Sequence, residues 1–130
     1  MIPGPQFTTQ DRRLSWILDP VDVCIHFALN CAGRSCPPIQ VYSAENIDQQ
    51  LNLASRNFVD ADLQIDQDRN TARLSAIFKW YAVDFGGQQG VTDFLLEHLG
   101  EGERKDWLEK NRESIDFTYK AYDWGLNSTQ

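Results

Sequence analysis

All three cysteines of the chain and one of its two histidines lie close together in the first third of the sequence. A thiol hydrolase needs a cysteine whose thiolate is favoured by a nearby imidazolium, together with a polar group that orients the ring. His26 with Cys31 or Cys36 supplies the first two groups, so these three residues are the candidate catalytic set. Asn30 and Asp123 are candidates for the orienting group, although neither is supported by its spacing.

A redox role is the second chemistry open to this segment. Four residues separate Cys31 from Cys36, and this spacing permits a disulfide if the loop folds back and brings the two α-carbons within about 7 Å. Pro37 and Pro38 favour such a closed loop. In a reducing cytosol such a disulfide would be labile or regulatory. The spacing also lacks the Cys-x-x-Cys signature of thioredoxin-like catalysts.

Two further interpretations involve the same residues. Cys24, His26, Cys31 and Cys36 are four potential zinc ligands, but their spacing matches no standard zinc knuckle, so we expect neither a metal nor another cofactor. Alternatively, Cys24 and Cys36 are small buried apolar residues and His26 is a hydrogen-bonded core histidine. This alternative agrees with the general tendency of free cysteines to be buried.

The element that positions His26 is predicted to be a strand. Residues 23–30 alternate apolar side chains with a second set that includes His26, and this is the two-residue period of a strand. The next segment, CAGRSCPP at 31–38, cannot continue a ladder and is predicted to be an ordered loop. A helix is then expected behind Ser43 as its N-cap. Its apolar residues recur at helical spacing at Ile47, Leu51, Ala54 and Phe58.

The remaining elements mix short strands with helices. An antiparallel hairpin is predicted from residues 63–66 and 71–74, and a closing strand from 115–122. Helices are predicted over residues 75–85 with Ser75 as N-cap, over 91–99 and over 103–112. Since no regular β-α-β repeat occurs, the predicted class is α+β, a short mixed or antiparallel sheet packed by about four helices.

The first twenty residues are predicted to behave differently from the rest. Prolines and a glycine flank a short LSWIL run, which indicates an extended lead-in over residues 1–20. Its Leu14, Trp16 and Leu18 are expected to pack onto the body. Residues 21–127 then form a single domain.

Two features outside the cysteine segment also have alternative roles. In the helix over 75–85, a stripe of aromatic and aliphatic residues is more often core packing than a ligand platform. The residues expected to face inward are Ile77, Phe78 and Tyr81, with Lys79 and Trp80 facing outward. His98, at a helix end, is expected to be a surface residue whose charge suits the C-terminal dipole.

Composition restricts the partners. The 130 residues include 19 acidic and 12 basic side chains, for a net charge of −7. This excess of acid argues against a general nucleic-acid binder and against a surface held on anionic lipid. No apolar run is long enough to span a membrane. No signal peptide is visible at the N-terminus, so a cytoplasmic location is expected.

Three strings occur in one order along the chain: HFALNCAGRSCPPI at 26–39, IFKWYAVDFGG at 77–87 and YDWGLN at 122–127. Together they resemble the domain of unknown function 547, a family found in bacteria, plants and animals. The family pattern starts further upstream, with an asparagine-rich helical segment of the kind WINLYNA, and this chain resembles its C-terminal half. The resemblance constrains the fold and the location of the site more than the reaction. The family's Cys and His content has invited comparison with papain-like thiol hydrolases.

These observations leave two classes of function. The first is an interaction or structural module in this truncated form, in which a protein partner or the missing N-terminal segment covers an apolar patch larger than a monomer tolerates. The alternative is a papain-like thiol hydrolase or a thiol-redox protein that uses His26 with Cys31 or Cys36. Whether the protein is an enzyme is left open by the sequence.

Overall fold

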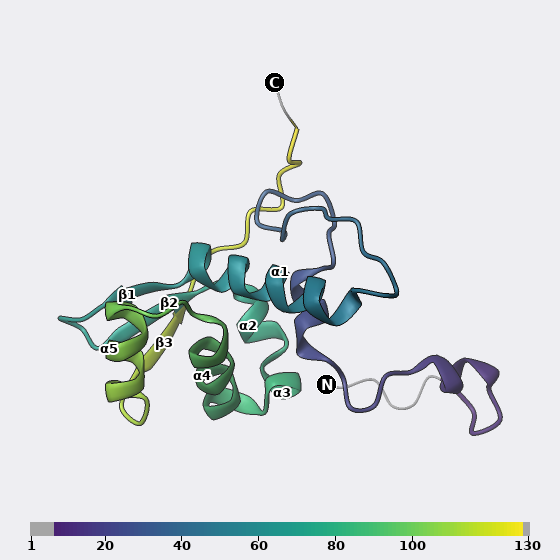
Figure 1. The fold of residues 1–130 in the computed structure, drawn as a ribbon, viewed down its shortest axis with the longest axis horizontal. Coiled ribbons are helices and arrows are strands. Elements are labelled where there is room, and N and C mark those ends of the chain that lie inside the picture. Colours follow the sequence, from purple (N-terminus) through teal and green to yellow (C-terminus); the bar gives the residue numbers. More distant parts are fainter. Residues whose placement is uncertain (1–6, 129–130) are drawn as a thin grey trace.

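A computed structural model describes residues 7–128 of the chain (Figure 1). Five α-helices and three strands follow two short 3₁₀-helices. The 3₁₀-helices are η1 (Arg12–Trp16) and η2 (Val23–Phe27). The helices are α1 (Ile47–Asp62), α2 (Ala76–Trp80), α3 (Ala82–Phe85), α4 (Gly87–His98) and α5 (Glu103–Asn111), and the strands are β1 (Gln64–Asp66), β2 (Thr71–Leu74) and β3 (Asp116–Tyr119).

The sheet is small and mixed, in the order β1-β2-β3. β1 and β2 form the predicted antiparallel hairpin, with Ile65 opposite Ala72, and β3 adds in parallel to β2, with Phe117 opposite Ala72. Along β2, Ala72 and Leu74 are buried while Arg73 between them is exposed, as the two-residue period requires. The structure confirms the predicted α+β class.

The core lies where helices α1, α2 and α4 meet the sheet and η2. Four phenylalanine rings fill its centre. The Phe27 ring lies 5.4 Å from both Phe78 and Phe94, and the Phe85 and Phe94 rings are 5.1 Å apart. Burying one such side chain contributes about 2 kcal/mol of stability. The core therefore fixes η2 and α2, the two elements that lead into the cysteine loop and the aromatic residues near it.

The prediction of a strand at residues 23–30 is wrong, because this segment forms η2. Asp22 caps it by accepting a hydrogen bond from the Cys24 N–H at 2.9 Å. The i→i+3 bonds, such as Ala28 N–H to the Ile25 carbonyl, then satisfy the backbone without a neighbouring strand. The apolar alternation is broken as well, since Phe27 is buried whereas Leu29 is exposed.

The helix predicted behind Ser43 begins later, at Ile47. Ser43 starts a turn in which the Asn46 N–H donates to its carbonyl, and Asn46 is the N-cap residue, without a side-chain capping bond. The Gln50 side chain accepts from the Ser43 N–H at 2.8 Å and donates to the Val41 carbonyl at 3.1 Å. The predicted inner face is otherwise confirmed, with Leu51 and Ala54 buried.

The helix predicted over residues 75–85 is divided at Tyr81 into α2 and α3. Ser75 caps α2 as predicted, accepting from the Ile77 N–H. The expectation that Tyr81 faces inward is wrong, because the break turns its side chain outward, whereas Ile77, Phe78 and Phe85 are buried.

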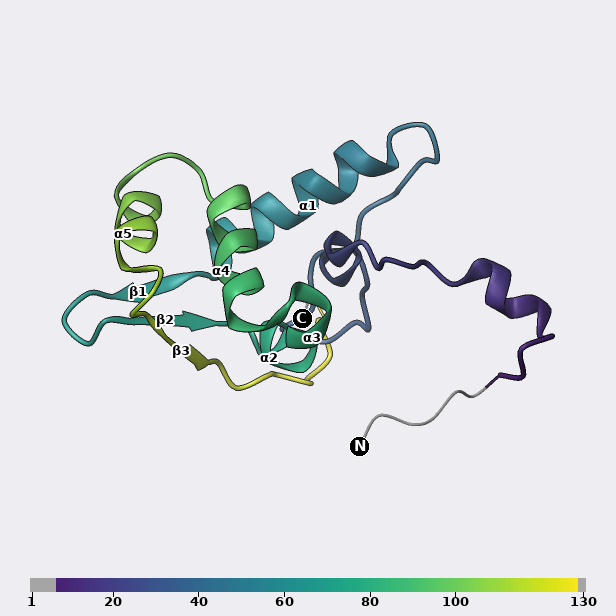
Figure 2. The same ribbon diagram turned by 90° about the horizontal axis from the view of Figure 1, so that it is seen from below.

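Leu14, Trp16 and Leu18 of the lead-in do not pack onto the body, so the expectation for these three residues is wrong. All three side chains are exposed, Trp16 by 77%. Figures 1 and 2 both show this arm extending from the body on the side away from the sheet. Its polar bonds are local, since Asp11 caps η1 and pairs with Arg13. No helix within residues 7–128 is long and apolar enough to cross a membrane.

Candidate functional site

A cavity of about 340 Å³ lies between η2, the cysteine loop, α2 and the segment after β3. The three residues that the sequence predicted, His26, Cys31 and Cys36, all line it. Aromatic side chains form much of the remaining wall. The structure therefore brings the predicted site residues to one cavity, and the question becomes which of them contact one another.

Cys31 and Cys36 are in direct contact. Their Sγ atoms lie 2.7 Å apart, and both carry free thiols. The loop closes because the Cys36 N–H donates to the Gly33 carbonyl at 3.0 Å, and the Cys31 N–H donates to Cys36 Sγ at 3.3 Å. Ala32 takes the left-handed backbone conformation, with φ of 63°, that this tight turn needs. The predicted folding back of the loop is thus observed.

Asn30 holds this loop in place and does not orient the histidine. Its side-chain oxygen accepts from the Ala32 N–H at 2.7 Å, and its amide donates to the Pro37 carbonyl at 2.5 Å. These two bonds join the start of the loop to its end. Asn30 therefore stabilises the closed conformation of the loop that contains the two cysteines.

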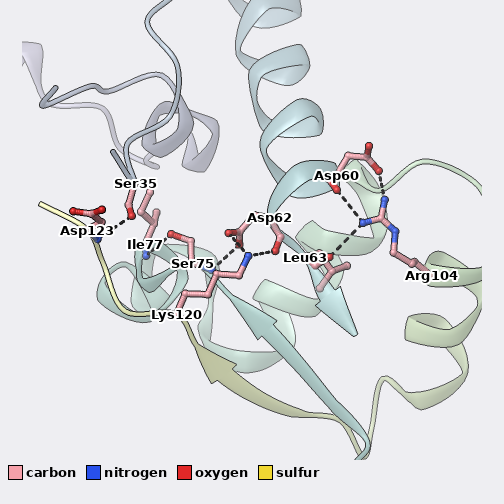
Figure 3. Close-up of polar contacts among 9 residues, drawn as sticks. All are labelled: Ser35, Asp60, Asp62, Leu63, Ser75, Ile77, Arg104, Lys120 and Asp123. Atoms are coloured by element: carbon pink, nitrogen blue, oxygen red, sulfur yellow. Dashed lines mark hydrogen bonds and ion pairs between the residues drawn. The ribbon is translucent and has the colours of Figure 1, made fainter. Parts of the chain in front are cut away.

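The segment after β3 is fastened to the same loop. The Arg34 N–H donates to the Gly125 carbonyl at 2.9 Å, and the Asn127 N–H to the Ala32 carbonyl at 2.8 Å. The Asp123 N–H donates to Ser35 Oγ at 2.9 Å (Figure 3). Asp123 also pairs with Arg34 across 3.6 Å. The Asp123 carboxylate is therefore engaged at the loop and does not orient His26.

An ion pair positions the start of this segment. Lys120, directly after β3, donates to Asp62 Oδ1 at 2.8 Å, and the other oxygen of Asp62 accepts from the Ser75 N–H at 2.6 Å (Figure 3). One carboxylate at the end of α1 thus joins the exit of β3 to the start of α2. Tyr122 follows two residues later and reaches the cavity.

Tyr122 provides the third contact at Cys36. Its hydroxyl lies 3.2 Å from Cys36 Sγ. Burial by itself raises the pKa of the Cys36 thiol, but hydrogen bonds from Cys31 and Tyr122 outweigh it and lower the pKa to about 7. Burial raises the pKa of the Tyr122 hydroxyl, and the adjacent Cys36 sulfur raises it further, so this hydroxyl stays a donor. Cys36 is consequently a thiol that ionises near neutral pH.

The His26 ring contacts Asp84 and Tyr81 rather than the two loop cysteines. Its Nε2 lies 3.0 Å from Asp84 Oδ2, and its ring stacks on Tyr81 with centroids 4.0 Å apart. Within residues 7–128 no hydrogen bond joins the His26 ring to a thiol. The ring is 8% exposed, as the core-histidine alternative expects. Asp84 is the group that orients it, and no local signal in the sequence links two residues that are 58 positions apart.

The second histidine, His98, is in a position that the sequence analysis did not foresee. It is 3% exposed and stacks on Phe94, so the expectation of a surface cap is wrong. Its Nδ1 donates to the Phe94 carbonyl at 2.9 Å, which leaves Nε2 as an acceptor for Cys24 Sγ at 3.8 Å and Asn52 Nδ2 at 3.5 Å. Burial raises the pKa of the Cys24 thiol. This second Cys–His pair is therefore a contact between η2 and α4.

Aromatic side chains from two distant segments complete the cavity. Trp80, outward-facing as predicted, packs against Tyr122 with ring centroids 4.8 Å apart and against Trp124 at 5.7 Å. Tyr122 and Trp124 are 4.6 Å apart. The string YDWGLN had identified this segment as part of the family pattern, but nothing in its spacing indicated that it would reach the cysteine loop. No group of three or more metal-ligating side chains is found in the described part of the chain.

Fold and site together define a small α+β protein with a thiol pair in an aromatic cavity. The family model described as "Protein of unknown function, DUF547" matches residues 2–59, which confirms the resemblance seen in the sequence. Residues 2–59, which include the first of the three strings, are thus similar to this family, whereas the strings at 77–87 and 122–127 lie outside the match. The matched segment contains η2 and the whole cysteine loop, whereas Tyr122 and Trp124 lie outside it. Neither the curated proteins nor the solved structures include a match to this chain.

Proposed function

We propose that Cys31 and Cys36 form a thiol–disulfide exchange site at the wall of the cavity. The observation that carries the proposal is the contact between the two sulfur atoms, 2.7 Å apart. The donors aimed at Cys36 Sγ, the Cys31 N–H and the Tyr122 hydroxyl, add to it because they stabilise a thiolate at that sulfur. The thiolate is the form of cysteine that attacks a disulfide.

The reaction proceeds in two exchanges. The Cys36 thiolate attacks one sulfur of a partner disulfide, RS–SR, so that a Cys36–SR bond forms, the S–S bond breaks and RS⁻ leaves. Cys31 gives its proton to the departed thiolate and then attacks Cys36 Sγ. This second step forms the Cys31–Cys36 disulfide and releases the second RS⁻. Two electrons have passed from the dithiol to the partner.

The hydrolase alternative has less support. A cysteine hydrolase needs an imidazole within hydrogen-bond reach of the nucleophile, and His26 is held by Asp84 instead. The pair that does have such contact, Cys24 with His98, has its thiol pKa raised by burial rather than lowered. Neither arrangement produces an activated thiolate beside a free imidazole.

Redox titration of the full chain tests the proposal. The protein is equilibrated with mixtures of reduced and oxidised glutathione, quenched with acid, alkylated and mapped by mass spectrometry. We expect a Cys31–Cys36 linkage to accumulate while Cys24 stays free. Cys31→Ser should leave a lasting glutathione adduct on Cys36, and the control Cys24→Ser should leave the equilibrium of the pair unchanged. Glutathione spread over all three cysteines without an internal linkage would overturn the proposal.

The cellular setting follows from the same chemistry. We infer a cytoplasmic location, in which the reducing environment keeps the pair as a dithiol until a disulfide reaches it. The net charge of −7 supports a protein or small-molecule disulfide as the partner, rather than nucleic acid.

The exposed arm supports a second role, as an interaction module. Trp16, Ile17 and Leu18 expose apolar side chains on one short segment, and such segments typically bind another protein. We infer that the lead-in over residues 1–20 binds a protein partner, while residues 21–127 form the single domain that carries the thiol pair. The two roles are compatible, because arm and cavity involve different residues.

A further inference from the structure

The lining of the cavity beside the thiols contains few charged side chains. Apart from His26, whose ring contacts Asp84, the only ionisable side chains among its described lining residues are the two thiols and the phenols of Tyr81 and Tyr122. Arg34 and Asp123, which pair with each other, are not among the lining residues. A charged group that entered the cavity would lose water without gaining a counter-charge, which costs free energy.

Aromatic rings form the wall that faces such a guest. Trp80 and Trp124 stack at 5.7 Å with their planes 24° apart, and both keep about half or more of their surface exposed, 48% and 67%. Exposed indole faces bind flat apolar groups by stacking, which contributes about 1 kcal/mol beyond burial. Cys31 and Cys36 line the same cavity, so a group stacked on these rings is held next to the reactive sulfurs.

We propose that the partner of the exchange site is a disulfide of an uncharged thiol that carries an aromatic group beside its sulfur, such as a cysteine next to phenylalanine in a neutral peptide segment. This inference rests on the proposed exchange function and names its substrate class. Trp80 and Trp124 position the aromatic group, and the chemical steps at Cys36 and Cys31 are unchanged. The net charge of −7 acts in the same direction against anionic partners.

The test compares disulfides that differ only next to the cysteine. The probes are the symmetric disulfides of N-acetyl-Phe-Cys-amide, N-acetyl-Ala-Cys-amide and N-acetyl-Glu-Cys-amide, and each rate of oxidation of the reduced full chain is divided by that of free N-acetylcysteine amide with the same probe. We expect the Phe probe to react about five-fold faster than the Ala probe, and the Glu probe to be the slowest of the three.

Variants assign the preference to the rings. Trp124→Ala and Trp80→Ala should each reduce the Phe-to-Ala ratio towards one. The control Leu53→Ala, an exposed apolar residue of α1 outside the cavity lining, should keep the ratio. Because Trp124 is mostly exposed, its removal leaves the core intact, and the circular dichroism spectrum checks this.

The outcomes separate the two proposals. Equal normalised rates for the three probes, with the Cys31–Cys36 linkage still formed, would overturn the substrate class and leave the exchange function standing. A preference for the Phe probe that survives in both tryptophan variants would also overturn it. Failure of every probe to produce the linkage would contradict the exchange function itself.

Discussion

Cys24 and Cys36 differ in the pKa of their thiols because the surroundings of the two sulfurs differ. Cys24 is enclosed by core residues and lies near the carboxylates of Asp22 and Glu97, so burial and then charge raise its pKa. Cys36 has two donors aimed at its sulfur, and its pKa is lowered to about 7. Near neutral pH the chain therefore carries one thiol that is about half ionised and another that is protonated.

This difference predicts a pH dependence at Cys36. Alkylation of the reduced chain by iodoacetamide should follow the thiolate, so the rate at Cys36 rises through a midpoint near pH 7, whereas Cys24 reacts slowly until the pH is well above that. Tyr122→Phe removes one donor to the thiolate, and the midpoint at Cys36 should move upward. Peptide mapping of samples quenched over time, from pH 5 to pH 10, measures each cysteine separately.

The matched control is Tyr119→Phe, which deletes a hydroxyl on β3 that is not hydrogen-bonded to a thiol. Its midpoint should equal that of the unchanged chain. The lowered pKa of Cys36 also makes the stability of the fold depend on pH. A depressed folded-state pKa adds stability at pH values above the unfolded thiol's pKa, and this contribution is lost as the pH falls through about 7. A Cys36 midpoint in Tyr122→Phe identical to that of the unchanged chain would show that the hydroxyl does not stabilise the thiolate.

At the scale of elements, the junction of α3 and α4 sets the position of Asp84 and thus of His26. Gly86 and Gly87 both take positive φ, 89° and 77°, which turns the chain sharply between the two helices. Gly90, in the first turns of α4, then lies against the end of α3. A β-carbon at Gly90 would come within 1.6 Å of the Phe85 carbonyl oxygen. The two helices can meet this closely only because position 90 has no side chain.

Gly90→Ala should therefore destabilise the fold strongly. The added methyl group meets backbone, which cannot rotate away, and the helices must separate around the buried Phe85 and Phe94. We expect a loss of about 3 kcal/mol in the free energy of unfolding, at the upper end of overpacking effects. Urea denaturation followed by circular dichroism measures it. Gly100→Ala is the control, since a β-carbon there meets nothing within 4 Å; equal midpoints for the two variants would contradict the close approach.

The start of α2 and the hairpin were predicted correctly from local sequence, whereas the helix with Ser43 as its expected cap begins only at Ile47. Ser75 was correctly predicted to cap α2, and the turn-rich spacer correctly predicted the hairpin over residues 63–74. The strand at 23–30 was wrong because the segment forms a 3₁₀-helix that buries the adjacent His26 and Phe27, and the two-residue alternation gave no sign of this or of the Asp22 cap. The spacing of Cys31 and Cys36 permitted their contact without predicting it. The contacts of Asp84 and Tyr122 were not predicted, because 58 and 86 residues separate them from His26 and Cys36.

At the scale of the whole molecule, the chain has a folded body and an arm that extends from it. The body buries its apolar residues around the four phenylalanines, whereas η1 contains no buried residue. The arm thus contributes exposed apolar area without contributing to the core. Its removal from water requires another molecule, as the interaction role proposes.

The double variant Trp16→Ser with Leu18→Ser tests this division. Because both side chains are exposed, the free energy of unfolding should change by less than about 0.5 kcal/mol. Binding of a hydrophobic dye and self-association in sedimentation velocity should both decrease. Val83→Ser, an exposed apolar residue of α3, is the control and should leave dye binding nearly unchanged. A large loss of stability in the double variant would instead mean that the arm packs on the body in solution.

The fastening of the segment after β3 to the cysteine loop has a consequence for biosynthesis. Cys36 leaves the ribosome 86 residues before Tyr122, an interval of roughly 4–17 s at usual elongation rates. During that time the nascent chain contains both cysteines but lacks the hydroxyl that helps to ionise Cys36 and the indole of Trp124. We therefore expect the Cys36 thiol of the growing chain to be less ionised than that of the finished protein, and slower to attack a disulfide.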